Sequence, residues 1–196
     1  DVGSTKGDVI EAARNGLQKQ FANFVPAHPI AGKEVSGIEH AEASLFTGRQ
    51  VVLTPVKATL RSNVQRASQL WSGIGAHVLT MSHEEHDSAF AAVSHLPHLL
   101  AFAYPTALVG QPQGERSLSL AGPGFRDFSR IAASDPVMWR DVLLANREQV
   151  LQQSQAFRQA LLDLEALMAA ADAPALEQAI AAASKARAAW QPDSEH

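Results

Sequence analysis

The chain has 196 residues, of which 46% are hydrophobic and 18% are charged, and this composition is typical of a globular protein. Its formal net charge of −4 excludes an overall positive field for binding nucleic acid or an anionic membrane surface. Because cysteine is absent, disulfides and thiolate metal sites are excluded, and a reducing compartment, the cytoplasm, is expected. No apolar run approaches about 20 residues, so we expect no membrane span.

Helical and strand patterns alternate over the first 82 residues. Apolar residues at helical spacing predict a first helix from Lys6, with Ser4 or Thr5 as its cap. A second helical pattern covers residues 59–73. Short β-prone runs bounded by proline or glycine cover residues 24–27, 50–54 and 77–80. This alternation predicts parallel α/β structure.

Beyond Ser82 the strand patterns disappear, and patterns rich in alanine and leucine predict an all-helical domain. We expect a helix over residues 84–104 that kinks at Pro97, because proline lacks an amide donor. A turn-rich connector is predicted over residues 110–124, because it contains several glycines and prolines.

A long helix is predicted over residues 142–170, where apolar residues repeat every seven positions. Apolar residues with this repeat lie along one face of the helix, and this face needs a partner to cover it, so we expect a two-fold dimer. A last helix is predicted over residues 174–190, and the polar tail after it is expected to be disordered.

Eight histidines occur in the chain, and four of them fall in one predicted helical region: His83, His86, His95 and His98. Histidines three residues apart share a helix face, so these pairs are candidate metal ligands. The alternative is that they are core or surface histidines, because the neighbouring acidic residues do not form the repeated carboxylate-histidine pattern of helical di-iron sites. A helical module that binds a metal or an effector is therefore our second hypothesis.

Seven motifs, in order and spacing, closely resemble the prephenate dehydrogenase family. They are Asp1–Lys6, His28–Gly37, Leu53–Pro55, His86–Asp87, Ser94–His98, Gly124–Arg130 and Ser134–Trp139. The resemblance extends roughly from Asp1 to Asn146, and so many motifs in the right order are far more specific than any one of them.

The resemblance implies a mainly α fold with a small α/β part. Residues 1–82 would be the C-terminal remnant of a Rossmann-like nucleotide-binding domain, and residues 83–196 an all-helical substrate-binding and dimerisation domain. The Gly-rich phosphate loop, first strand and acidic ribose-binding residue are missing, and Gly73–Ala76 does not replace them, because it precedes a strand. Since Asp1 is also not a methionine, we expect a piece of a longer protein that is inactive by itself.

The activity implied by the resemblance is oxidative decarboxylation of prephenate to 4-hydroxyphenylpyruvate with NAD, in tyrosine biosynthesis. An arogenate dehydrogenase or a dual-specificity cyclohexadienyl dehydrogenase, and NADP as the cofactor, stay open as alternatives. The resemblance also implies a homodimer and tyrosine as a feedback inhibitor. We expect neither nucleic acid nor membrane as a partner.

By the resemblance, His28 is the catalytic base, a task for which the pKa of histidine is well suited. Ser4 would bond the same substrate hydroxyl beside the nicotinamide, and Pro29 would contact the cofactor. Without the resemblance, the sequence around His28 would be interpreted as a surface turn, and Ser4 as a helix cap. The resemblance further implies that the substrate is bound by Arg130, His98, Glu34, Asp127, Trp139, His86 and His95.

In that group Arg130 would bind the substrate carboxylate, a bidentate task that suits arginine better than lysine. Asp127 and Glu34 would pair with this arginine or gate it, and Trp139 would reach the cleft of the neighbouring subunit. The alternatives are a surface ion pair for Asp127 and Glu34 and a core aromatic for Trp139. His98 would contact the substrate.

Overall fold

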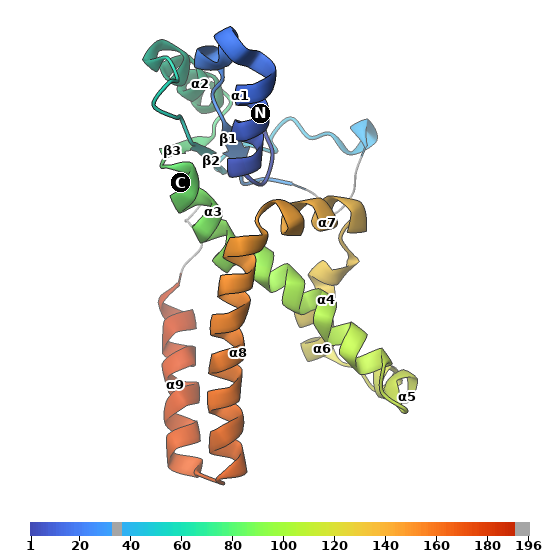
Figure 1. Ribbon diagram of the computed structural model, residues 1–196. Coiled ribbons are helices and arrows are strands. Elements are labelled where there is room, and N and C mark those ends of the chain that lie inside the picture. Colours follow the sequence, from blue (N-terminus) through green and yellow to red (C-terminus); the bar gives the residue numbers. More distant parts are fainter. Residues whose placement is uncertain (33–36, 191–196) are drawn as a thin grey trace. The chain divides into compact units, whose positions relative to one another are not determined.

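The computed structural model describes residues 1–32 and 37–190. Helices make up most of the described chain, which also contains a three-stranded sheet, so the predicted mainly α fold class is confirmed. The chain divides into two compact units, residues 1–150 and 151–196. The boundary expected between residues 82 and 83 stays a prediction. Figure 1 gives the order of the elements.

The sheet has the strand order β1-β2-β3, formed by Ala27–Pro29, Gln50–Leu53 and His77–Thr80. The two later strands pair in parallel, as predicted, whereas β1 is antiparallel to β2. The first strand begins at Ala27 instead of Phe24, because the backbone N–H of Phe24 donates to Phe21 and closes a 3-10 turn.

The core of this part lies around β2, whose residues Val51 to Leu53 are fully buried. The helix α2 (Arg61–Gly73) packs Val64, Ala67 and Trp71 against this core. These three residues recur at helical spacing, so one face of α2 meets the sheet. The predicted helix over residues 59–73 is confirmed, with its start at Arg61.

The first helix, α1 (Gly7–Leu17), follows the predicted helical pattern, but the predicted cap is wrong. Neither Ser4 nor Thr5 caps it, because its N-cap residue is Lys6, which makes no capping bond with its side chain. The carboxylate of Asp87 instead accepts the backbone N–H groups of Lys6 and Gly7, at 3.0 and 2.8 Å. An acidic side chain that is distant in the sequence thus accepts from backbone N–H groups that have no partner within the helix.

The helix predicted over residues 84–104 consists of three segments, α3 (His83–Phe90), a π-helical turn (Ala91–His95) and α4 (Leu96–Val109). Pro97 lies in the first turn of α4, directly after the π turn, and has no backbone N–H to donate there. The wider turn precedes the proline, and the N–H of Leu96 bonds to the carbonyl of Ala91, five residues back. Such π turns occur frequently at functional sites.

Two corrections concern the segment that follows. The predicted connector over residues 110–124 contains a short helix, α5 (Gly114–Ser119). The helix predicted to begin at residue 142 is divided at Asn146 into α7 (Pro136–Ala145) and α8 (Arg147–Ala169). Between α5 and α7 lie α6 (Pro123–Ser129) and a 3-10 turn (Arg130–Ala133).

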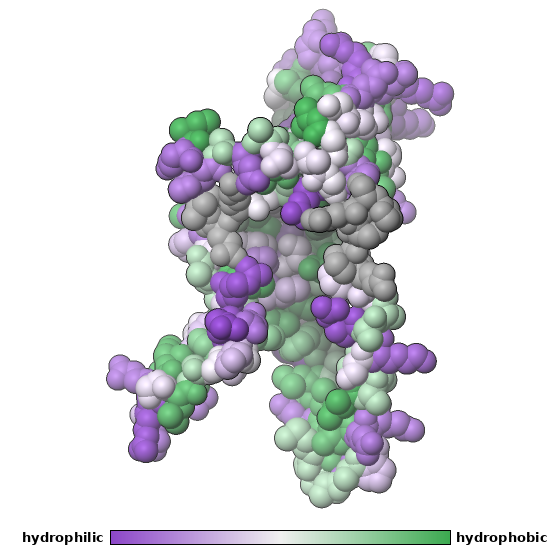
Figure 2. All heavy atoms as spheres, turned by 180° about the vertical axis from the view of Figure 1, so that it is seen from behind, coloured by the Kyte–Doolittle hydropathy of each residue, from purple (hydrophilic) through white to green (hydrophobic). Residues whose placement is uncertain are grey.

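The second unit contains the rest of α8 and α9 (Ala173–Ala189), which agrees with the helix predicted over residues 174–190. Asp172 caps α9 by accepting the N–H of Ala175. Apolar side chains are exposed on this unit (Figure 2), among them Leu151, Leu162, Met168 and Ile180. The polar tail, expected to be disordered, falls mostly on residues 191–196, which lie outside the described residues. Within the described chain, no helix has both the length and the apolar character to span a bilayer.

Candidate active site

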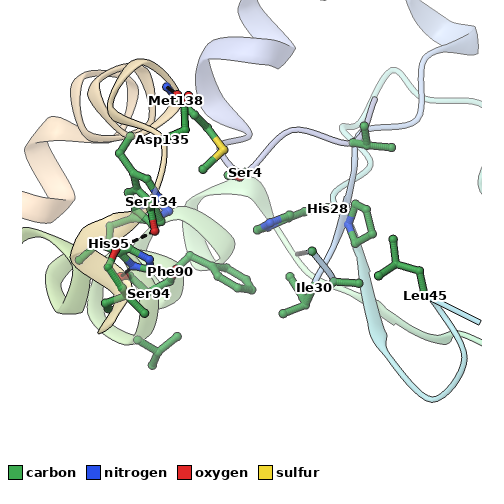
Figure 3. Close-up of a pocket in the computed structure, with 18 of the residues that line it drawn as sticks. Ser4, His28, Ile30, Leu45, Phe90, Ser94, His95, Ser134, Asp135 and Met138 are labelled. Atoms are coloured by element: carbon green, nitrogen blue, oxygen red, sulfur yellow. Dashed lines mark hydrogen bonds between the residues drawn. The ribbon is translucent and has the colours of Figure 1, made fainter. Parts of the chain in front are cut away.

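A cavity of about 770 Å³ opens in the first unit beside the end of β1 (Figure 3). Its walls come from the N-terminal segment, the end of β1, the π turn with the start of α4, and α7. Six of the residues with roles implied by the sequence line it: Ser4, His28, Pro29, His95, His98 and Trp139.

The remaining four lie elsewhere. His86 is fully buried behind His28, and Arg130 is exposed at the start of the 3-10 turn after α6. Asp127 is also exposed and forms an ion pair with its neighbour Arg126 at 2.9 Å. Glu34 lies outside the described residues.

His28 stands in the middle of β1 and is half-buried at the cavity. Its Nδ1 lies 2.8 Å from Nε2 of His86, and the ring of Phe90 packs against it at 4.8 Å between centroids. Burial, and then the charges of His86, Lys6 and His95, lower the pKa of His28 to about 3, although Asp87 acts in the opposite direction. The imidazole is therefore neutral at neutral pH.

Behind His28, the Nδ1 of His86 lies 2.8 Å from a carboxylate oxygen of Asp87. Burial acts to raise the pKa of Asp87, but the hydrogen bonds from His86 and from the backbone of Gly7 and Lys6 outweigh it and hold this pKa below its usual value. Asp87 is thus an ionised acceptor at the end of a chain of two histidines.

The N-terminal motif has a structural task that sequence reasoning missed. Lys6 is completely buried, and its ammonium donates to the carbonyl of Ala27 at 2.8 Å and to the carboxylate of Asp1. Asp1 also accepts the backbone N–H of Ala27. Burial is the main cause that lowers the pKa of Lys6 to about 8. These bonds tie the residue next to His28 to the start of the chain.

On the opposite wall, His98 stacks on Trp139 with 3.5 Å between ring centroids. Its Nδ1 lies 2.9 Å from the carbonyl of Ser94, which only accepts, so the proton of the neutral ring is on Nδ1 and Nε2 is left as an acceptor. Burial, partly opposed by that carbonyl, lowers the pKa of His98, and the charge of Arg130 lowers it further.

His95 is almost fully buried, and its Nδ1 lies 3.1 Å from the amide nitrogen of Asn146. Burial lowers the pKa of His95 to about 4; Asp87 opposes this shift, whereas His86 and His98 add to it. In residues 1–32 and 37–190 no group of three or more histidine, aspartate or glutamate side chains converges as metal ligands would. The histidines of the candidate metal pairs bond to protein groups, such as His83 to Glu84 at 3.1 Å.

Comparison with known proteins decides the family. The family described as "Prephenate dehydrogenase, nucleotide-binding domain" matches residues 1–80, and "Prephenate dehydrogenase, dimerization domain" matches residues 82–182. The chain belongs to the prephenate dehydrogenase family. The resemblance expected from the motifs is thereby confirmed.

Relatives within the prephenate dehydrogenase family include the prephenate dehydrogenase of Bacillus subtilis (strain 168), 40% identical over 77% of this chain and 41% of that protein. The cyclohexadienyl dehydrogenase of Zymomonas mobilis is 33% identical over 98% of this chain and 66% of that protein. A crystal structure of the prephenate dehydrogenase from A. aeolicus, in complex with hydroxyphenyl propionate and NAD+, is 39% identical with a TM-score of 0.88, covering 95% of this chain and 65% of that one. The chain thus spans between two fifths and two thirds of these relatives.

Proposed function

We propose that this chain belongs to an enzyme that oxidatively decarboxylates prephenate to 4-hydroxyphenylpyruvate with NAD. Residues 1–82 would be the part of the nucleotide-binding domain that carries His28, and residues 83–196 the substrate-binding and dimerisation domain. The observation that carries the proposal is the chain of hydrogen bonds from Asp87 through His86 to His28 at the wall of a substrate-sized cavity. The names of the relatives support the same reaction.

The hydrogen-bond chain supports Nε2 as the nitrogen of His28 that would act as the base. The ionised carboxylate of Asp87 only accepts, so Nδ1 of His86 carries a proton, and when the ring holds one proton its Nε2 carries none. That Nε2 accepts from Nδ1 of His28, which leaves the lone pair of His28 on its own Nε2. His28 would therefore take the proton of the substrate hydroxyl through Nε2.

Proton removal by His28 converts the ring hydroxyl into a carbonyl while hydride leaves the same carbon. The ring carboxylate on the opposite side then departs as CO2, and aromatisation drives the reaction. The pKa of His28, about 3 without substrate, is low for a base, but a substrate with two carboxylates raises it by favouring the imidazolium. His86 and Asp87 would stabilise the charge that develops on His28.

NAD, when bound, supplies the hydride acceptor. Ser4 and Pro29 line the cavity on the side of the nucleotide-binding part, and they would contact the nicotinamide end of the cofactor. Ser4 would also bond the substrate hydroxyl beside His28. On the other side, we assign the substrate to His98, His95 and Trp139, with Arg130 holding a carboxylate.

We further propose that the active protein is a cytoplasmic homodimer. The match of residues 82–182 to a dimerisation domain supports the homodimer, as do the apolar side chains exposed on the second unit. Tyrosine has the same hydroxylated aromatic ring as the product, and its carboxylate takes the place of the carboxylate of the product's pyruvyl chain, so we expect it to compete for the same cavity.

The test is a rate measurement on the full-length protein, in which reduction of NAD is followed with prephenate as the substrate. Arogenate in place of prephenate, and NADP in place of NAD, identify the preferred pair. The proposal expects the highest kcat/KM with prephenate and NAD. A protein that reduces neither cofactor with prephenate would refute it.

A further inference from the structure

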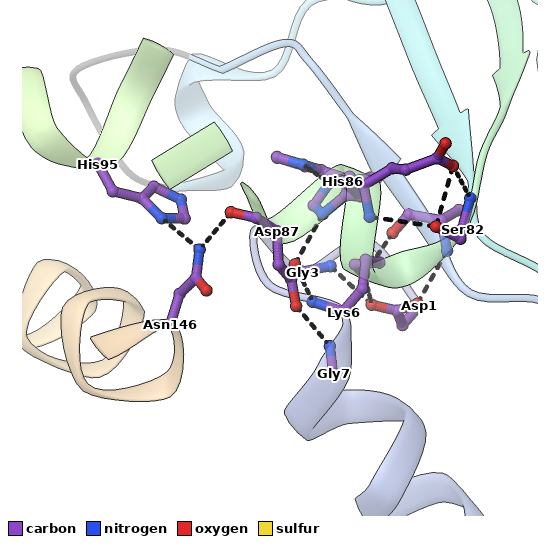
Figure 4. Close-up of polar contacts among 12 residues, drawn as sticks. Asp1, Gly3, Lys6, Gly7, Ser82, His86, Asp87, His95 and Asn146 are labelled. Atoms are coloured by element: carbon purple, nitrogen blue, oxygen red, sulfur yellow. Dashed lines mark hydrogen bonds and ion pairs between the residues drawn. The ribbon is translucent and has the colours of Figure 1, made fainter. Parts of the chain in front are cut away.

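Asn146 lies at the break between α7 and α8 and was not among the residues expected at the site. It is 6% exposed, and its amide nitrogen lies within hydrogen-bonding distance of two groups (Figure 4). These are the backbone carbonyl of Asp87, at 2.7 Å, and Nδ1 of His95, at 3.1 Å. A buried amide is held here between two parts of the site.

The partners of this amide leave one arrangement of hydrogens. The carbonyl of Asp87 can only accept, so the side chain of Asn146 must turn its NH2 group, and not its oxygen, toward it. The same nitrogen then donates its second hydrogen to Nδ1 of His95, because an amide nitrogen does not accept. Nδ1 of His95 therefore carries no proton, and the proton of the neutral ring is on Nε2.

We propose that Asn146 is a positioning residue that keeps His95 in its neutral Nε2–H form, so that His95 offers a hydrogen-bond donor to an acceptor oxygen of the substrate. The assignment of that oxygen to a substrate rests on the proposed function. Within the described chain, Nε2 of His95 has no protein partner and is not among the buried unsatisfied atoms, and His95 lines the cavity. The donor thus faces the space where a substrate would lie.

Asp87 connects this arrangement to the base. Its carboxylate holds the proton of His86 on Nδ1, which leaves Nε2 of His28 as an acceptor. Its backbone carbonyl orients the amide of Asn146, which leaves Nε2 of His95 as a donor. The cavity therefore offers an acceptor and a donor on different walls. This pair is complementary to a substrate with a hydroxyl proton to give and an anionic or keto oxygen to bind. The amide of Asn146 does not ionise, so it directs the uncharged ring of His95 in the same way at every pH at which that ring is neutral.

The test is the tautomer of His95, read from ¹⁵N–¹H correlations of the imidazole nitrogens in the ¹⁵N-labelled 196-residue chain. The His95 signals are identified by their loss in His95→Gln. We expect a protonated Nε2 and an unprotonated Nδ1 at neutral pH. A proton on Nδ1 would overturn the inference, and this measurement needs no substitution at Asn146.

Asn146→Asp tests cause, because a carboxylate of the same shape accepts instead of donating. The proton of His95 should move to Nδ1 and the His95 pKa should rise, whereas Asn63→Asp, on α2 away from the cavity, should change neither. In the full-length enzyme, kcat/KM should fall about tenfold in Asn146→Asp, the effect of one lost hydrogen bond. An unchanged tautomer in Asn146→Asp would reduce Asn146 to a packing role. A protein with the expected tautomer but no dehydrogenase activity would instead refute the proposed function alone.

Discussion

Replacement of His86 tests the hydrogen-bond chain behind the base. In His86→Leu, a side chain of similar volume removes the acceptor that Nδ1 of His28 meets at 2.8 Å. His28 would still face the cavity, but the imidazolium formed during the reaction would have lost its partner. In His86→Gln, an amide oxygen near the former position of Nε2 can accept the same bond. The two variants therefore differ mainly in the hydrogen bond under test.

The expected magnitude follows from the kind of bond that is lost. A hydrogen bond to a charged group contributes about 1.5–3 kcal/mol. Since each 1.36 kcal/mol changes a rate tenfold, His86→Leu should lower kcat by about 10- to 150-fold. The KM for prephenate should change little, because His86 is fully buried and does not line the cavity. His86→Gln should recover most of the lost kcat.

The assay measures initial rates of NADH formation by the full-length enzyme, with saturating NAD and varied prephenate. Urea unfolding of each variant serves as the control for folding. The reasoning would be refuted if His86→Leu kept kcat within about threefold of the unsubstituted enzyme, since such a small effect lies below that of one charge-assisted hydrogen bond. Equal losses in the Gln and Leu variants would also refute it, because only the leucine lacks an acceptor.

Three further predictions concern His28, Arg130 and acid stability. His28→Asn should lose most turnover while prephenate binding, measured by calorimetry, stays nearly unchanged; wild-type turnover would exclude His28 as the base. Arg130→Ala should raise the KM for prephenate by about 10- to 150-fold with a smaller effect on kcat, because a charged hydrogen bond made in ground and transition states is lost; an unchanged KM would remove Arg130 from the substrate site. The folded-state pKa values of His28 and His95, about 3 and about 4, lie below the ordinary 6.5. Between these values and pH 6.5 the unfolded chain therefore binds more protons than the folded chain. Their contribution to stability is complete above pH 6.5 and is lost as the pH falls toward 4 and 3, on the order of 3 kcal/mol for each histidine by pH 4. Urea titrations of the 196-residue chain at pH 7 and 4 measure this loss, which should shrink in His95→Gln.

Local patterns predicted the elements whose signal lies within a short stretch of the chain. The strands at residues 50–54 and 77–80 were recognised as short β-prone runs bounded by proline or glycine, and the helix over residues 59–73 was recognised by its helical pattern. The break at Asn146 was missed because the heptad pattern continues across it, and a buried polar side chain there gives no local signal. The π turn before Pro97 was missed for a related reason, since proline marks a disturbed helix but not its form.

The sequence by itself determined the family, the mainly α fold and the candidate base, because motif order and residue type are properties of the chain alone. Only the tertiary structure decided what surrounds His28. Its partner His86 is 58 residues away in the sequence. The carboxylate of Asp87 accepts the backbone N–H groups of Lys6 and Gly7 at the start of α1, which are 81 and 80 residues away. The proton positions on His28 and His95 depend on these long-range contacts. A histidine in a motif can be an acid, a base or a donor, and the groups that fold against it select among these roles.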